Sequence, residues 1–188
     1  MIKIGVTGSL ASGKSTVAKI ISRGRHPLFD ADKVVKNLYK KRKFIKKIKK
    51  KFSIKKSKNI KKEIRNLVKN DKRKLKKLET IIHPLVRKEM RFLMKSKKNH
   101  KVLIFDIPLL IESKLMKYFD VIVFVGAKKN LRFKRYLQKK GNKKIFTILD
   151  KRQILPGKKI KISDHVIYNN KSLKALKRNV KFLMKNYE

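Results

Sequence analysis

Residues Gly8 to Ser15 have the types and the spacing that bind the phosphates of a nucleotide. Their order, Gly-Ser-Leu-Ala-Ser-Gly-Lys-Ser, matches the pattern of a phosphate-binding loop (P-loop). Gly8 and Gly13 allow backbone angles that strain other residues, so successive N–H groups can turn inward toward phosphate oxygens. The ammonium group of Lys14 can lie on the β- and γ-phosphates, and the hydroxyl group of Ser15 can bind Mg²⁺. The loop does not name the reaction, because GTPases, motor ATPases and small-molecule kinases share it.

Acidic side chains follow two further strand-like segments. Asp30 and Asp32 lie two residues apart at the end of the segment 26–30, and Asp106 follows the apolar segment 102–105. The carboxyl ends of parallel strands converge on a ligand crevice, where carboxylates can hold Mg²⁺ or accept a proton from a hydroxyl group. Asp32 could instead only cap a helix, and Asp106 could be an ordinary strand end. Because the chain has 12 acidic residues against 57 Lys and Arg, two acids this close favour a site.

Strand-like and helix-like segments alternate along the chain around these residues. The predicted strands are 2–7, 26–30, 102–105, 121–125 and 165–168, and helices are predicted over 15–21, from 32, over 130–140, 143–155 and 172–187. Pro156-Gly157 is expected to close the helix over 143–155. The alternation predicts an α/β fold with three layers, in which helices cover both faces of a parallel sheet.

Residues 40–98 differ from the rest, because they are dense in lysine and carry apolar residues at helical spacing. The run KKRKFIKKIKKK at 40–51 could be a basic, aromatic-interleaved patch that binds nucleic acid. It could also be one amphipathic helix in which Phe44, Ile48 and Phe52 are buried and the lysines are solvated. The second interpretation is favoured, because the apolar residues keep a helical period.

The composition of the 188-residue chain limits the classes of protein to consider. A formal net charge of +45 attracts polyanions, but the lysines are spread over most of the chain, which favours a biased composition over a nucleic-acid site. The chain has no cysteine, no secretion-signal pattern and no apolar run long enough to span a membrane. We therefore expect a cytoplasmic protein with no membrane insertion and no obligate nucleic acid, as a monomer or weak oligomer.

Five motifs, in this order along nearly the whole chain, resemble those of the dephospho-CoA kinase family. They are TGSLASGKST at 7–16, DAD at 30–32, His83-Pro84 followed by Arg87, DIPLLIE at 106–112 and SDHVIYNN at 163–170. The resemblance implies ATP-dependent phosphorylation of the ribose 3′-hydroxyl group of dephospho-CoA, with ATP and Mg²⁺ as cofactors. It implies a single P-loop kinase domain over 1–188, with a helical substrate-binding insertion over 37–98 and a lid over 128–157.

The resemblance also implies roles for individual residues. Asp32 matches the catalytic base, with Lys14 and Arg135 as the other catalytic residues. The implied nucleotide-binding residues are Gly8, Ala11, Ser12, Gly13, Lys14, Ser15, Thr16 and Asn169. The implied substrate-binding residues are Asp32, His83, Arg87, Asp106 and Leu109, and the implied metal ligands are Ser15 and Asp30. The alternative for His83 is a merely buried, hydrogen-bonded histidine.

Three positions depart from the family pattern. Ala11 stands where most members have glycine, and Leu149 stands where another lid arginine is expected. Arg135 of the lid is present, but its partner position holds Lys139, which cannot reproduce the two-pronged grip of arginine on phosphate. The nearby arginines that could take these places are Arg132 and Arg152. A kinase for nucleosides or nucleoside monophosphates, or a nucleic-acid-binding P-loop ATPase, remains the alternative function.

Overall fold

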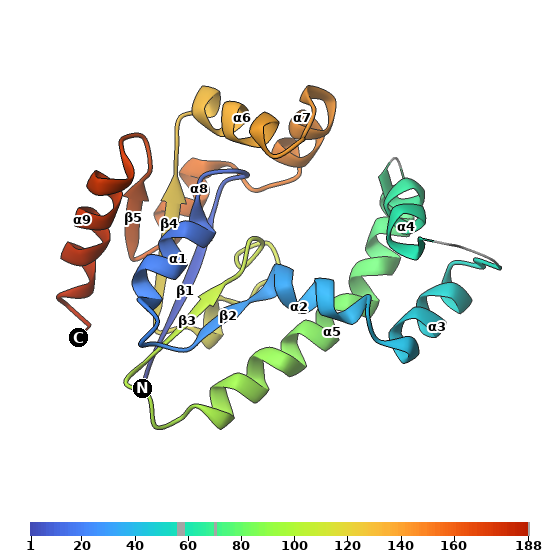
Figure 1. The fold of residues 1–188 in the computed structure, drawn as a ribbon, viewed down its shortest axis with the longest axis horizontal. Helices are drawn as coiled ribbons and strands as arrows, with labels where there is room; N and C mark the ends of the chain where they lie inside the picture. The colour runs from blue at the N-terminus through green and yellow to red at the C-terminus, as the bar shows by residue number, and fades with distance from the viewer. Residues whose placement is uncertain (56–58, 70, 188) are drawn as a thin grey trace. The chain divides into compact units, whose positions relative to one another are not determined.

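The computed structural model describes residues 1–55, 59–69 and 71–187. They form two compact units, one made of Met1–Asp30 and Ser96–Glu188 and the other of Ala31–Lys95. The first unit holds a parallel sheet and the second is helical (Figure 1).

The sheet of the first unit has five strands, β1 (Ile2–Gly8), β2 (Leu28–Asp30), β3 (Val102–Asp106), β4 (Val121–Gly126) and β5 (His165–Tyr168). Their order is β2-β3-β1-β4-β5, and every neighbouring pair is parallel. All residues of β3 and β4 are buried, as expected for strands covered on both faces. The strand predicted over 26–30 is shorter, because Pro27 has no N–H to donate and β2 begins at Leu28.

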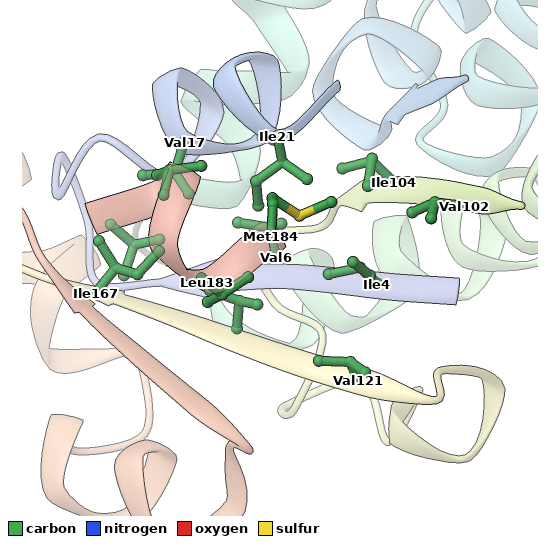
Figure 2. Close-up of a cluster of buried hydrophobic side chains, with 14 of the residues drawn as sticks. Ile4, Val6, Val17, Ile21, Val102, Ile104, Val121, Ile167, Leu183 and Met184 are labelled. Carbon is green, nitrogen blue, oxygen red and sulfur yellow. The ribbon is translucent and has the colours of Figure 1, made fainter. Parts of the chain in front are cut away.

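Helices α1 (Lys14–Ser22) and α9 (Leu173–Met184) cover one face of this sheet. Side chains from both helices meet those of the strands in a buried apolar cluster (Figure 2). The fully buried members include Ile4, Val6, Val17, Ile21, Ile104, Val123, Val180 and Met184. This cluster fixes the axis of α1, and with it the position of the phosphate loop that precedes the helix.

The other face is covered by the segment that follows β3 and by α8 (Pro156–Ile162). The ring of Phe105 packs against Phe29 (5.8 Å between centroids) and Phe119 (5.2 Å). A Cβ atom on Gly5 would lie 2.6 Å from Cδ1 of Leu110 and 3.0 Å from Phe119, so a larger residue there would force these side chains to shift. Helices on both faces confirm the predicted three-layer α/β fold.

The first unit also contains the short helix η1 (Met116–Tyr118), α6 (Lys129–Gln138) and α7 (Lys143–Lys151). The expectation that Pro156-Gly157 closes a helix over 143–155 is wrong. Helix α7 ends at Lys151, and Pro156 is the first residue of α8. The first turn of a helix suits proline, because its missing N–H would have no intrahelical acceptor there.

The second unit consists of α2 (Ala31–Leu38), α3 (Arg42–Lys51), α4 (Ile60–Lys69) and most of α5 (Lys72–Ser96). Its core is made by Leu38, Phe44, Ile48, Ile54, Ile64, Leu78 and Ile81. Phe44 and Ile48 are buried and the lysines of α3 lie mostly outside, so the amphipathic helix predicted in the run 40–51 is present from Arg42 onward. Phe52, expected to be buried on the same helix, follows the end of α3 and is only half-buried. No helix in the described part of the chain has the length and apolar character needed to cross a bilayer.

Candidate active site

The phosphate loop leaves β1 at Gly8 and enters α1 at Lys14. A Cβ atom on Gly8 would lie 2.5 Å from the carbonyl oxygen of Val125. Gly13 has a φ of 95°, and a Cβ atom there would collide with Nδ2 of Asn169. The strand, the loop and the neighbouring Asn169 therefore leave room only for glycine at both positions.

Ala11 adopts a left-handed backbone conformation, with a φ of 58°. An L-residue with a Cβ atom pays about 1–2 kcal/mol for this conformation, whereas glycine does not. The glycine that the family pattern has at this position therefore matches the backbone that the loop adopts here. The loop keeps its shape with alanine, at a local energetic cost.

Helix α1 begins directly after the phosphate loop, at Lys14. Its first N–H groups have no intrahelical acceptor, and the helix dipole adds a partial positive charge there, so the position suits an anion. Lys14 and Ser15 are half-buried in the first turn, and Thr16 is exposed. These groups can bind phosphate oxygens together with the backbone of the loop.

Asp30 and Asp106 lie opposite each other at the ends of adjacent strands β2 and β3. Leu28 and Ile104, each two residues earlier, pack into the cluster under α1, and side chains alternate along a strand, so both carboxylates lie on the face that α1 covers. The site therefore offers two carboxylates on the same face of the sheet as Ser15.

These oxygen donors fit Mg²⁺, which proteins hold through one or two carboxylates together with substrate phosphates. Within the described part of the chain, no three His, Asp or Glu side chains form a cluster that could hold a metal ion alone. That arrangement suits a metal ion that arrives with the nucleotide.

Arg135 and Asn169 contact the loop from α6 and from the end of β5. Nδ2 of Asn169 donates a hydrogen bond to the backbone oxygen of Ser12 (2.9 Å). Arg135 donates to the backbone oxygens of Asn169 (3.0 Å) and Ser12 (3.5 Å). The structure thus brings both predicted residues to the phosphate loop.

Arg132 is not an exposed lid cation. Its side chain is buried, and its guanidinium group pairs with Asp150 at 2.6 Å. It also donates to the backbone oxygens of Leu10 (3.2 Å) and Ala127 (3.2 Å). The idea that Arg132 replaces a lid arginine on the phosphates is therefore wrong, because its donors are used within the protein.

The other lid positions and Leu109 differ in their exposure. Lys139 follows α6 and is exposed, and Arg152 follows α7 and is exposed. Leu149 is half-buried within α7. Leu109 is half-buried after β3, where its carbonyl oxygen accepts from the N–H of Ser113 (2.9 Å).

Asp32, His83 and Arg87 belong to the second unit. Asp32 is exposed in the first turn of α2, and His83 and Arg87 lie four residues apart on one side of α5. Burial lowers the pKa of His83 below its ordinary value of 6.5; Glu79 opposes this shift and Arg87 adds to it. Burial therefore favours the neutral imidazole form of His83.

Gln153, Glu112 and Lys159 also join the surroundings of the loop, and sequence reasoning assigned them no role. The backbone N–H of Leu10 donates to Oε1 of Gln153 (2.8 Å). Glu112 forms an ion pair with the buried Lys159 (2.6 Å) and accepts from the N–H of Ile154 (3.2 Å). A scarce acid inside the DIPLLIE motif was the only available signal for this group; nothing in the local sequence marks Gln153.

The parallel sheet, the phosphate loop and the carboxylates at the strand ends define a P-loop kinase. A sequence model of the family described as dephospho-CoA kinase matches residues 2–175. The chain belongs to the dephospho-CoA kinase family.

Individual relatives agree with this assignment. A dephospho-CoA kinase from Fusobacterium nucleatum is 38% identical over 94% of each chain, and one from Bartonella henselae is 35% identical over 97% of this chain and 96% of the relative. The crystal structure of a Thermus thermophilus protein has a TM-score of 0.82 at 26% identity and covers 100% of this chain and 98% of its own. A dephospho-CoA kinase from Campylobacter jejuni has a TM-score of 0.66 at 25% identity, over 99% and 97%.

Proposed function

We propose that this protein transfers the γ-phosphoryl group of ATP to the ribose 3′-hydroxyl group of dephospho-CoA, which yields coenzyme A. The observation that carries the proposal is the match to the dephospho-CoA kinase family over residues 2–175, with an intact phosphate loop inside it. Phosphoryl transfer needs positioning and charge neutralisation more than covalent chemistry, and the cations and N–H groups around the loop supply both.

Each group in the proposed site has a separate task. Lys14 and Arg135 neutralise charge on the phosphates that the backbone of residues 11–16 binds, and Asn169 contacts the nucleotide. Ser15 and Asp30 hold Mg²⁺, which neutralises phosphate charge when it is bound. On the acceptor side, the substrate-binding residues are Asp32, His83, Arg87, Asp106 and Leu109.

Asp32 is proposed as the base that accepts the proton of the acceptor hydroxyl group. It follows Asp30, the last residue of β2, by two residues, which limits the distance between their Cα atoms to about 7 Å. Asp32 is exposed, so its carboxylate is open to a substrate. A carboxylate two residues after a strand end suits the acceptance of a proton from a hydroxyl group.

We also assign roles to two longer segments of the chain. Residues 37–98 act as the substrate-binding insertion of a single kinase domain, and residues 128–157 act as a lid. We place the reaction in the cytoplasm, where ATP is available, and expect a monomer or weak oligomer with no need for nucleic acid or membrane.

A substrate panel tests the proposal. ATP consumption is measured with dephospho-CoA, AMP, UMP and nucleosides as acceptors, and the phosphorylated product is identified by mass spectrometry. We expect turnover with dephospho-CoA, and its loss in Lys14→Ala. Turnover with AMP but not with dephospho-CoA would overturn the proposal, and RNA-stimulated ATP hydrolysis without any acceptor would indicate a nucleic-acid-dependent ATPase.

A further inference from the structure

The peptide groups of Leu10, at the tip of the phosphate loop, are held from two sides by the segment that follows β4. The N–H of Leu10 donates to Gln153 (2.8 Å), and its carbonyl oxygen accepts from Arg132 (3.2 Å). The next residue, Ala11, has the unfavourable φ of 58°. Contacts that fix Leu10 therefore also restrict the backbone just before the most strained residue of the loop.

Gln153 lies between α7 and α8, and its backbone N–H donates to the carbonyl oxygen of Asp150 (3.2 Å) in the last turn of α7. The N–H of the next residue, Ile154, donates to Oε1 of Glu112 (3.2 Å), and Glu112 pairs with Lys159 at 2.6 Å. Lys159 is fully buried, and a buried ammonium group without a carboxylate would be strongly destabilising. The ion pair therefore fixes Glu112, and Glu112 fixes the backbone from which Gln153 reaches the loop.

We propose that Gln153 is a positioning residue for the phosphate loop, and that the buried pair Glu112–Lys159 acts on the loop through it. Gln153 holds the N–H of Leu10 and so fixes the peptide group just before Ala11, where the loop begins its left-handed turn. The ion pair is thus linked to the loop by two hydrogen bonds, from the N–H of Ile154 to Glu112 and from the N–H of Leu10 to Gln153. The inference rests on the proposed function only for the identity of the nucleotide, ATP.

Replacing Gln153 with leucine removes the acceptor and keeps a side chain of similar size. One hydrogen bond contributes about 1 kcal/mol, so Gln153→Leu should weaken ATP binding roughly threefold to tenfold. The control is Asn99→Leu, which also replaces an amide side chain with leucine, at an exposed position outside the lid and the substrate-binding insertion. That variant should behave as the wild type.

The test measures Kd for a non-hydrolysable ATP analogue by calorimetry, KM for both substrates, and the melting temperature. We expect Kd for the analogue and KM for ATP to rise in Gln153→Leu, while KM for dephospho-CoA and the melting temperature stay near the wild-type values. Unchanged nucleotide affinity would overturn the proposal. A parallel loss of affinity for both substrates and of thermal stability would also overturn it, because that pattern indicates a general structural role.

A second set of variants tests whether the ion pair acts through Gln153. The double variant Glu112→Leu with Lys159→Met replaces the pair with apolar side chains, a change that proteins often tolerate. It should weaken ATP binding to the same extent as Gln153→Leu, and the triple variant should be no weaker than either. Additive losses would mean that the pair acts by another route.

The two proposals fail in different measurements. If the wild type transfers nothing to dephospho-CoA but binds the ATP analogue, the proposed function fails and the comparison of Gln153→Leu with Asn99→Leu still decides the positioning role. If the wild type transfers phosphate and both variants bind the analogue equally, only the positioning role fails.

Discussion

The two compact units bury apolar residues in different ways, and only the first carries a motif that identifies its chemistry. In Met1–Asp30 with Ser96–Glu188, whole strands are buried and the phosphate loop depends on backbone positions such as Gly8 and Gly13. In Ala31–Lys95, amphipathic helices each bury one side, while lysine fills much of the exposed surface. The first unit therefore tolerates few substitutions near the loop, and the second tolerates many on its surface.

The first unit also contains buried cationic side chains. Within the first unit, Lys159 and Arg132 are buried, and each pairs with an acid, Glu112 and Asp150 respectively. A buried charge requires such a partner, whereas an exposed lysine requires none. The few acids of this chain thus include two that neutralise buried cations and two, Asp30 and Asp106, at strand ends.

The largest expected effect comes from the second unit, at Asp32. Asp32→Asn should lower kcat by about 10²–10⁴, the usual contribution of a general base, and leave ATP binding nearly intact. Steady-state kinetics and calorimetry with an ATP analogue check this. Asp71→Asn, which changes another acid of the same unit, is the control and should keep its kcat; an active Asp32→Asn would refute the role of Asp32 as base.

An Ile→Ala substitution in the core of each unit should show whether the two units unfold independently. Ile48 and Ile104 are both fully buried, so Ile→Ala should cost about 2–5 kcal/mol at either position. On heating, Ile104→Ala should lose ATP binding and transfer together, whereas Ile48→Ala should lose transfer first and keep ATP binding. Ligand-binding and activity measurements at rising temperature check this, and simultaneous loss in Ile48→Ala would show that the units unfold as one.

Gly13 and Gly24 both have positive φ, but only Gly13 is crowded. Alanine at Gly24 (φ 71°) meets open space, so Gly24→Ala should cost only about 1 kcal/mol of stability. Gly13→Ala should also displace the Asn169 amide and weaken ATP binding roughly tenfold or more, because the loop must move. Calorimetry on both variants checks this; equal ATP affinities would show that Asn169 does not hold the loop.

A small increase in stability is expected from a substitution at Ala11. Ala11→Gly should relieve a left-handed conformation and raise the free energy of unfolding of the first unit by up to about 1 kcal/mol. Chemical denaturation, followed by a probe in the sheet, measures this. A matched change at exposed Lys19 of α1, Lys19→Gly, should lower stability instead, and a loss of stability in Ala11→Gly would contradict the strain at Ala11.

The smallest expected effect is the pH dependence at His83. Because burial lowers its pKa in the folded state, the unfolded state binds the proton first as the pH falls through 6.5. Stability should therefore be unaffected by this group above that pH and decrease as the pH falls toward 5. Urea midpoints between pH 5 and 7.5 should show a weaker dependence on pH in His83→Gln than in the wild type, and an equal dependence would contradict the lowered pKa of His83.

Much of the fold follows from short-range patterns. The apolar runs 102–105 and 121–125 predict strands, and the helical spacing of Phe44 and Ile48 predicts a helix. Both patterns can be read from a few neighbouring residues, without knowledge of distant contacts. The break after Lys151 was missed, because Pro156 has the same local appearance whether it ends one helix or begins the next. The alternation of strands and helices predicts that Asp30 and Asp106 lie at the same edge of the sheet. The register of β2 and β3 shows that they lie directly opposite each other.

The phosphate loop, its glycines and the scarce acids after the strands are properties of the sequence itself, because residue type alone decides which side chains can bind phosphate or accept a proton. Only the tertiary structure decided that Arg132 holds Leu10 rather than phosphate, that Ala11 is left-handed, and that Gln153 reaches the loop. These contacts join residues more than a hundred positions apart, and burial and hydrogen-bond geometry at such separations depend on how the whole sheet is assembled.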